Sequence, residues 1–129
     1  MGTTAPSQHH APGEAVPANV REIAAAGGDA FGILWRLREE GRQLDANLVH
    51  LPAGERIGTH AEPDLDLLLV VVTGTGTLTT EDGALPLASG SLAWLAHGQA
   101  RAVEAGPEGL SYLTVHRRRE GMRIGFPAP

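Results

Sequence analysis

From residue 31 onward the sequence is a series of short apolar or alternating segments, separated by turns that contain glycine or proline. Segments of about four to eight residues with this punctuation are typical of β-strands, and many such strands in series form a sandwich or a barrel. The 129 residues suit one domain, which can bury a core without disulfide bonds. We therefore expect a single all-β domain.

The glycine and proline turns also set the bounds of the expected elements. Residues 18–26 predict a short helix that Asn19 caps, and a β-turn is predicted at residues 73–76. The chain divides into a disordered tail (1–16), a helix with the leading strand (17–42) and the barrel (43–125). The expected strands are 31–38, 43–51, 56–61, 65–72, 75–81, 84–87, 91–95, 100–105 and 109–117, with an edge piece near 122–124.

Composition and charge exclude several kinds of function. The net charge of −5 argues against nucleic acid as a partner, which needs an excess of basic residues on one surface. The absence of cysteine excludes thiolate zinc and thiol catalysis, and the absence of lysine excludes Schiff-base chemistry. The one basic cluster, residues 117–119, is most simply a solvated strand end, with an anionic ligand or a partner subunit as alternatives.

The sequence contains no run of about 18 apolar residues and no secretory signal at its N-terminus. We therefore expect no membrane partner and a cytoplasmic location.

Two stretches carry a more specific pattern. In the first, five residues separate Gly54 from His60, Glu62 follows two positions later, and an apolar strand leads to Gly74. In the second, Gly90 and Gly98 keep a regular spacing, followed by Arg101.

These stretches resemble the two motifs of the cupin superfamily, specifically its small single-domain bacterial members. The resemblance covers roughly residues 43–117 and implies a jelly-roll β-barrel with a short N-terminal helix or extension. It also implies a homodimer, because small cupins often dimerise.

The resemblance implies a metal held by three histidines and a glutamate, and this sequence departs from that set. His60 matches the first histidine, Glu62 stands at the second and Arg101 at the third. The position of the glutamate ligand in the motif is ambiguous. It falls on Asp66 when counted from His60, or on Leu67 when counted back from Gly74. Only one of these two neighbours can face the interior, because side chains alternate along a strand. The expected cofactor is therefore none or a single divalent transition metal bound by His60 and Glu62.

Arginine cannot ligate a metal, because its guanidinium keeps its proton and has no free lone pair. We therefore predict that Glu62 and Arg101 pair inside the barrel, so that Arg101 supplies the positive charge of the missing metal. Alanine at position 101 would then cost about 3 kcal/mol by leaving Glu62 unpaired.

Three functions remain open. The first is a small-molecule isomerase, cyclase or lyase, with His60 as proton shuttle. Glu62 would orient or protonate the ligand, and Arg101 would hold a carboxylate or enolate oxygen. Asp66 and His116 would also contact the ligand, which we expect to be anionic. The second is a metal-dependent, dioxygenase-like cupin, and the third is a non-catalytic binding or sensing module. Whether the chain is an enzyme is left open.

Overall fold

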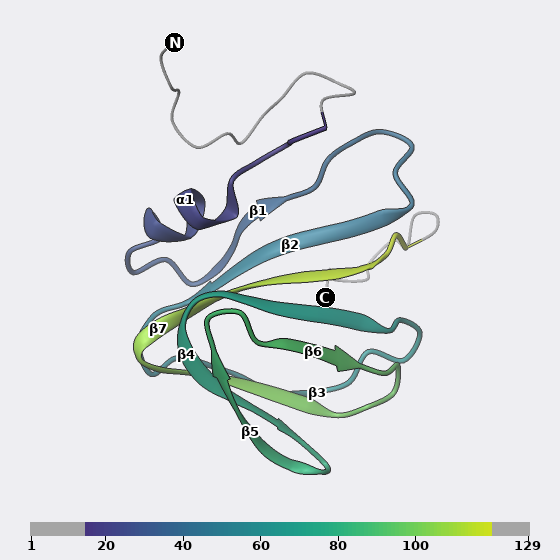
Figure 1. Ribbon diagram of the computed structural model, residues 1–129. Helices are drawn as coiled ribbons and strands as arrows, with labels where there is room; N and C mark the ends of the chain where they lie inside the picture. Colours follow the sequence, from purple (N-terminus) through teal and green to yellow (C-terminus); the bar gives the residue numbers. More distant parts are fainter. Residues whose placement is uncertain (1–14, 120–129) are drawn as a thin grey trace.

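The computed structural model describes residues 15–119, which form seven β-strands and one short helix (Figure 1). The helix α1 spans Val20–Ala25. The strands are β1 (Gly32–Arg36), β2 (Leu44–Leu51), β3 (Arg56–His60), β4 (Leu67–Thr80), β5 (Gly83–Ala88), β6 (Leu92–Leu95) and β7 (Arg101–Arg117).

All strand pairs are antiparallel, and β4 and β7 are long enough to take part in two sheets. One sheet contains β1, β2, the second half of β7, the first half of β4, and β6. The other contains β3, the first half of β7, the second half of β4, and β5. The two sheets are thus halves of one barrel, which confirms the predicted all-β jelly-roll architecture.

The prediction of separate strands on either side of residues 73–76 is wrong. β4 runs through these residues as one strand, and β7 likewise joins the two strands predicted at 100–105 and 109–117. Their pairing shifts register twice, between Val71 and Thr73 and between Gly74 and Gly76, so the glycines bend a continuous strand instead of ending it. Both strands curve sharply at the left of Figure 1.

Gly74 is required at this bend for two reasons. Its φ of 87° lies in the left-handed region, which side chains other than glycine rarely adopt. A Cβ atom on Gly74 would also collide with the backbone carbonyl of Gly109 on β7. The bend therefore depends on close contact between two glycine-containing backbones.

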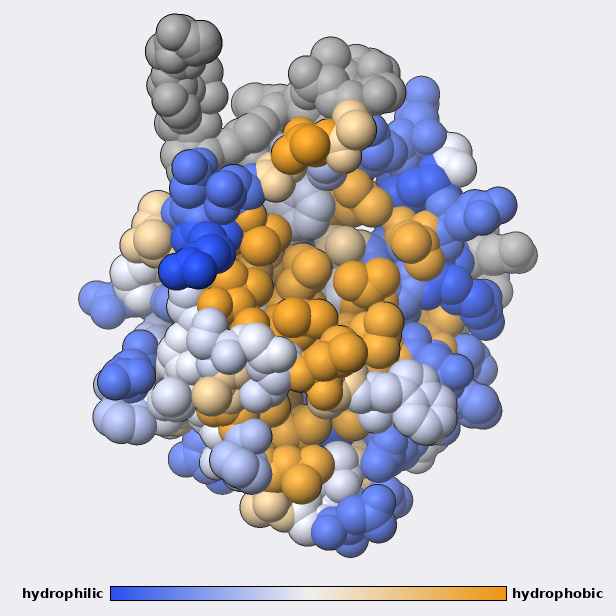
Figure 2. Space-filling view, in the orientation of Figure 1, coloured by the Kyte–Doolittle hydropathy of each residue, from blue (hydrophilic) through white to orange (hydrophobic). Residues whose placement is uncertain are grey.

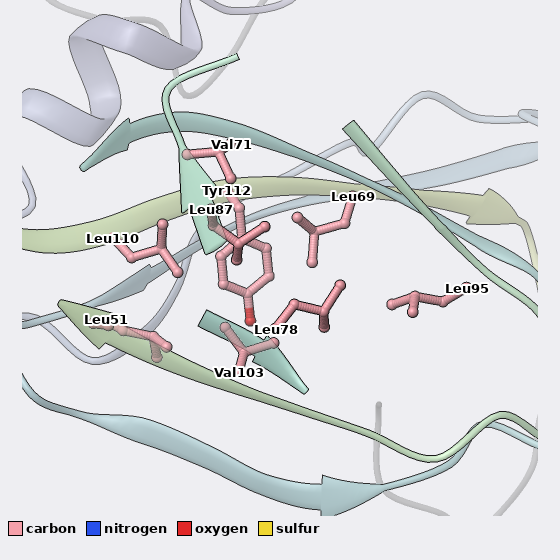
Figure 3. Packing of buried hydrophobic residues seen from close by; sticks show 10 residues of the cluster. Leu51, Leu69, Val71, Leu78, Leu87, Leu95, Val103, Leu110 and Tyr112 are labelled. Atoms are coloured by element: carbon pink, nitrogen blue, oxygen red, sulfur yellow. The ribbon is translucent and has the colours of Figure 1, made fainter. Parts of the chain in front are cut away.

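The main core lies between the two sheets. Figure 3 shows Leu69, Leu78 and Tyr112 pointing toward one another in this space. The pKa of Tyr112 is raised because its phenol is buried. The buried members of this cluster are Leu51, Leu69, Val71, Leu78, Leu87, Leu95, Val103, Ala105, Leu110 and Tyr112.

A second cluster lies under α1, on the outside of the first sheet, where Ile23 and Ala24 pack on Trp35 and Leu48. The side chain of Asn19 accepts a hydrogen bond from the backbone N–H of Glu22, at 3.1 Å, as predicted for the N-cap. The helix is shorter than the predicted 18–26.

The part of this outer face beyond α1 exposes large apolar side chains. Leu68 on β4 and Leu92 and Trp94 on β6 are 42%, 65% and 63% exposed. Figure 2 shows apolar residues gathered on this face, over β2, β4 and β6 in the orientation of Figure 1.

Within residues 15–119, no helix has the length and apolar character needed to cross a membrane. The predicted edge piece at 122–124 and most of the predicted tail at 1–16 fall outside the described residues.

Candidate functional site

One end of the barrel carries most of the candidate residues. We define the polar end by His60, Glu62, Arg101, His116 and Arg119. Arg101 starts β7 in one sheet, whereas His116 lies near the end of β7 in the other. The bends in β4 and β7 fold these distant parts of the chain onto each other.

Arg101 is the most buried charged residue of the site, with 4% of its surface exposed. Its Nη2 donates to the backbone carbonyl of Ala96 at 3.3 Å. Its Nε–H is buried and has no hydrogen-bond partner among residues 15–119. Burial lowers the pKa of Arg101, and the nearby carboxylate of Glu62 partly opposes this effect. The side chain is therefore a buried cation that is incompletely hydrogen-bonded.

Glu62 lies in the segment between β3 and β4, with its side chain 12% exposed. Its carboxylate forms an ion pair with Arg119 and accepts a hydrogen bond from the backbone N–H of Asp64 at 3.0 Å. Burial alone would raise the pKa of Glu62, but these two hydrogen bonds and the charges of Arg119 and His116 hold it below its ordinary value. Glu62 is thus an ionised carboxylate near neutral pH.

The predicted direct pair between Glu62 and Arg101 is replaced by a different arrangement. Within residues 15–119, Glu62 forms its hydrogen-bonded ion pair with Arg119. The charge of Glu62 partly opposes the lowering of the pKa of Arg101 by burial, but the two side chains share no hydrogen bond. Arg119 belongs to the basic cluster that the sequence most simply suggested was solvated. Its Nε–H is also buried without a partner in this range.

His60 ends β3 directly opposite Arg101 on β7. It is exposed, and its Nδ1 donates to the backbone carbonyl of Gly58 at 2.9 Å. Because a carbonyl can only accept, Nδ1 carries the proton and Nε2 carries the lone pair in the neutral ring. His60 therefore lies at the rim of the polar end, with one nitrogen free to exchange a proton.

His116 is buried, with 6% of its surface exposed. Its Nδ1 donates to the backbone carbonyl of Arg117 at 2.8 Å, which again leaves Nε2 as the acceptor of the neutral ring. The protonated ring of His116 would help to lower the pKa of Glu62, so the two side chains are close. The structure thus brings His116 to the same end as Glu62.

Asp66 lies apart from these residues. It is exposed and accepts hydrogen bonds from the backbone N–H and from Nδ1 of His97, at 2.9 and 2.8 Å. The bonds from His97 lower the pKa of Asp66. Leu67, not Asp66, packs against the core, which resolves the ambiguity in the motif.

A surface hollow of about 270 Å³ is lined by Asp64, Asp66, His97 and Arg117. It adjoins the polar end, because the backbone of Asp64 binds Glu62 and the backbone of Arg117 binds His116. Solvent therefore reaches the neighbourhood of the polar end from this side.

The donor set does not fit the usual cupin metal. Among residues 15–119, no group of three or more His, Asp or Glu side chains is arranged to hold a metal ion. Glu62 is already bound to Arg119, and Arg101 would repel a divalent cation at the position of the third histidine. The polar end is built around cationic side chains instead.

Neither a family model nor a curated protein matches this sequence. Solved structures do match. A Bacillus halodurans protein is 19% identical, over 85% of this chain and 86% of that one, with a TM-score of 0.67. The cupin domain of Schizosaccharomyces pombe Cnp3 is 15% identical, over 65% of this chain and 62% of that one, with a TM-score of 0.58.

A putative sugar phosphate isomerase from Acidithiobacillus ferrooxidans is 26% identical, over 60% of this chain and 52% of that one, with a TM-score of 0.55. This chain thus spans about half the length of that protein. The chain therefore has the fold of solved cupin proteins, as the glycine spacing in the sequence predicted.

Proposed function

We propose that this chain binds a small organic anion at the polar end of its barrel, with Arg101 in the role that a metal ion has in other cupins. The observation that carries the proposal is the buried Nε–H of Arg101, which has no partner in the described chain. An unpaired buried donor costs about 1–3 kcal/mol, and an oxygen atom of an anionic ligand would satisfy it. A guanidinium also matches carboxylate and phosphate groups in geometry.

Within this proposal the chemistry is proton transfer, as in an isomerase, cyclase or lyase. A fixed cation in a partly buried site stabilises an enolate or another oxyanion that forms when a neighbouring carbon loses its proton. His60 is the proton shuttle, because it stands opposite Arg101 and its Nε2 is free to accept a proton. The name of the Acidithiobacillus protein, a putative sugar phosphate isomerase, supports a test with phosphorylated sugars first.

The binding step is tested by titrating aldose and ketose phosphates and hydroxy acids into untagged protein, with calorimetry as the readout. Arg101→Met should weaken the binding of any ligand found by roughly tenfold to hundredfold. Arg56→Met is the matched control, since Arg56 is an exposed arginine on β3, and it should bind like the wild type. Equal affinity in the wild type and Arg101→Met would refute the proposal.

The chemical step is tested by following the exchange of carbon-bound hydrogen with deuterated water by NMR. His60→Gln should bind the ligand with unchanged affinity and lose the exchange. Ligand binding with no exchange in the wild type would favour the binding or sensing module instead. Stoichiometric iron, manganese, nickel or zinc in the purified protein would favour the metal-dependent alternative.

A further inference from the structure

Two arginines at the polar end have a buried Nε–H without a hydrogen-bond partner, and these are the two such side-chain atoms in residues 15–119. They belong to Arg101 and Arg119. Buried polar atoms without a partner are rare in native proteins, and a ligand is one physical explanation for them. Both atoms lie in the same part of the barrel.

Both guanidinium groups act on one carboxylate. Arg119 forms an ion pair with Glu62, and the charge of Glu62 opposes the effect of burial on the pKa of Arg101. Arg101 starts β7, whereas Arg119 lies just after its end. Only the folded barrel therefore places the two arginines around the same anion. The chain itself thus supplies an anion to a site with two guanidinium groups.

We propose that Arg101 and Arg119 together bind the phosphoryl group of a small molecule, and that Glu62 is the internal anion which this phosphoryl group displaces. The inference rests on the proposed function and adds to it the class of the ligand and a second binding arginine.

The chemistry of the two arginines favours a phosphoryl group over a single carboxylate. Each guanidinium presents a planar fork of N–H donors that pairs with two acceptor oxygens. A phosphate monoester offers three terminal oxygens and a charge close to −2 near neutral pH, whereas a carboxylate has two oxygens and a single charge. Two guanidinium groups around one anion can therefore bind more acceptor oxygens than a carboxylate provides.

Glu62 is suited to displacement because few contacts hold its carboxylate. Besides Arg119, it accepts one hydrogen bond, from the backbone N–H of Asp64. Its side chain belongs to the segment that links β3 to β4 and is 12% exposed, so part of it already meets solvent. A phosphoryl group bound next to Glu62 would repel its carboxylate, because neighbouring like charges destabilise each other.

This arrangement predicts opposite effects for the three charged residues. Removing the fork of Arg101 or of Arg119 should weaken phosphate binding roughly tenfold to hundredfold, the range for a lost hydrogen bond to a charged group. Replacing Glu62 by glutamine removes the competing charge and nearly preserves its shape, so it should tighten binding by about tenfold. If Glu62 contacted the ligand directly, the same substitution would weaken binding.

The experiment uses the full chain and three probes, namely inorganic phosphate, glycerol phosphate and acetate, with affinities from calorimetry and from phosphorus NMR. The variants are Arg101→Met, Arg119→Met, Glu62→Gln and the control Arg56→Met, each checked for folding by circular dichroism. Arg101→Lys and Arg119→Lys serve if a methionine variant does not fold, because they keep the charge and remove only the planar fork.

The expected result is binding of both phosphates in preference to acetate, weaker binding in the Arg101 and Arg119 variants, and tighter binding in Glu62→Gln. Unchanged affinity in Arg119→Met, or weaker binding in Glu62→Gln, would overturn this inference while leaving the role of Arg101 intact. Tight acetate binding that equals phosphate binding would also overturn the phosphoryl assignment. Failure of every anion to bind, or full binding in Arg101→Met, would instead refute the proposed function.

Discussion

Arg101 at the start of β7 and His60 at the end of β3 are direct partners in the register of the barrel, yet one is buried and the other exposed. The pair therefore spans the boundary between the interior of the barrel and solvent. A ligand held by Arg101 would have its reacting carbon near the rim, where His60 can exchange protons with water. This relationship is the geometric basis of the proposed chemistry.

Arg101→Met should leave the free energy of unfolding unchanged or raise it by about 1–2 kcal/mol, because an apolar side chain of similar length removes a buried charge and an unpaired donor. Arg101→Ala should cost less than the 3 kcal/mol predicted from the sequence. Glu62 keeps its ion pair with Arg119 in that variant. Urea unfolding of both variants measures this. A loss of several kcal/mol in Arg101→Met would show that the charge stabilises the fold.

Glu62 should make stability depend on acid pH. Its pKa in the folded protein lies below the ordinary value of 4.5, so the folded state binds its proton less readily than the unfolded state. Its contribution to stability is therefore complete above pH 4.5 and is lost as the pH falls through the lower folded value.

Glu62→Gln should remove this component of acid sensitivity. Thermal unfolding of the wild type and of the variant from neutral pH downward measures the difference. Parallel curves for the two proteins would show that Glu62 does not contribute. Glu55→Gln is a control, because Glu55 is an exposed glutamate outside the polar end.

The motif glycines explain why the fold could be predicted from the sequence. Gly54, Gly74, Gly90 and Gly98 all have positive φ angles, between 77° and 92°, in the structure. Their spacing therefore records where the backbone must take conformations that other residues rarely adopt. The continuity of β4 could not be predicted from the sequence. A pair of glycines looks the same in the sequence whether the strand bends there or ends in a turn, and only the pairing of β4 with β7 distinguishes the two cases.

The site could be predicted in part for a similar reason. Arg101 occupies a ligand position of the motif, which predicts that it faces the interior, and the structure buries it. The partner of Glu62 could not be predicted, since Arg119 is 57 residues away in the sequence and beyond both motifs. The triplet of arginines was the available signal, but a run of charges more often lies on a solvated surface.

The predicted homodimer can be tested on the exposed apolar face of β4 and β6. A second copy covering Leu68 and Trp94 would bury apolar side chains that a monomer leaves in water. Light scattering should give twice the chain mass for the wild type and the monomer mass for Trp94→Glu. Leu85→Glu is the matched control, because Leu85 is 49% exposed on β5, in the other sheet, and it should stay dimeric. A monomeric wild type would contradict the prediction.

The bend in β4 should be the most sensitive backbone position in the barrel. Gly74→Ala adds a Cβ atom that meets the carbonyl of Gly109, so β4 and β7 would have to separate where they hold the two sheets together. Gly41→Ala is the control, since Gly41 also has a positive φ, of 74°, but no atom lies within 4 Å of its added Cβ. The control should cost about 1–2 kcal/mol, the penalty for the left-handed conformation alone. Gly74→Ala should cost clearly more in urea unfolding, and equal losses in the two variants would mean that β4 and β7 can move apart at the bend without loss of stability.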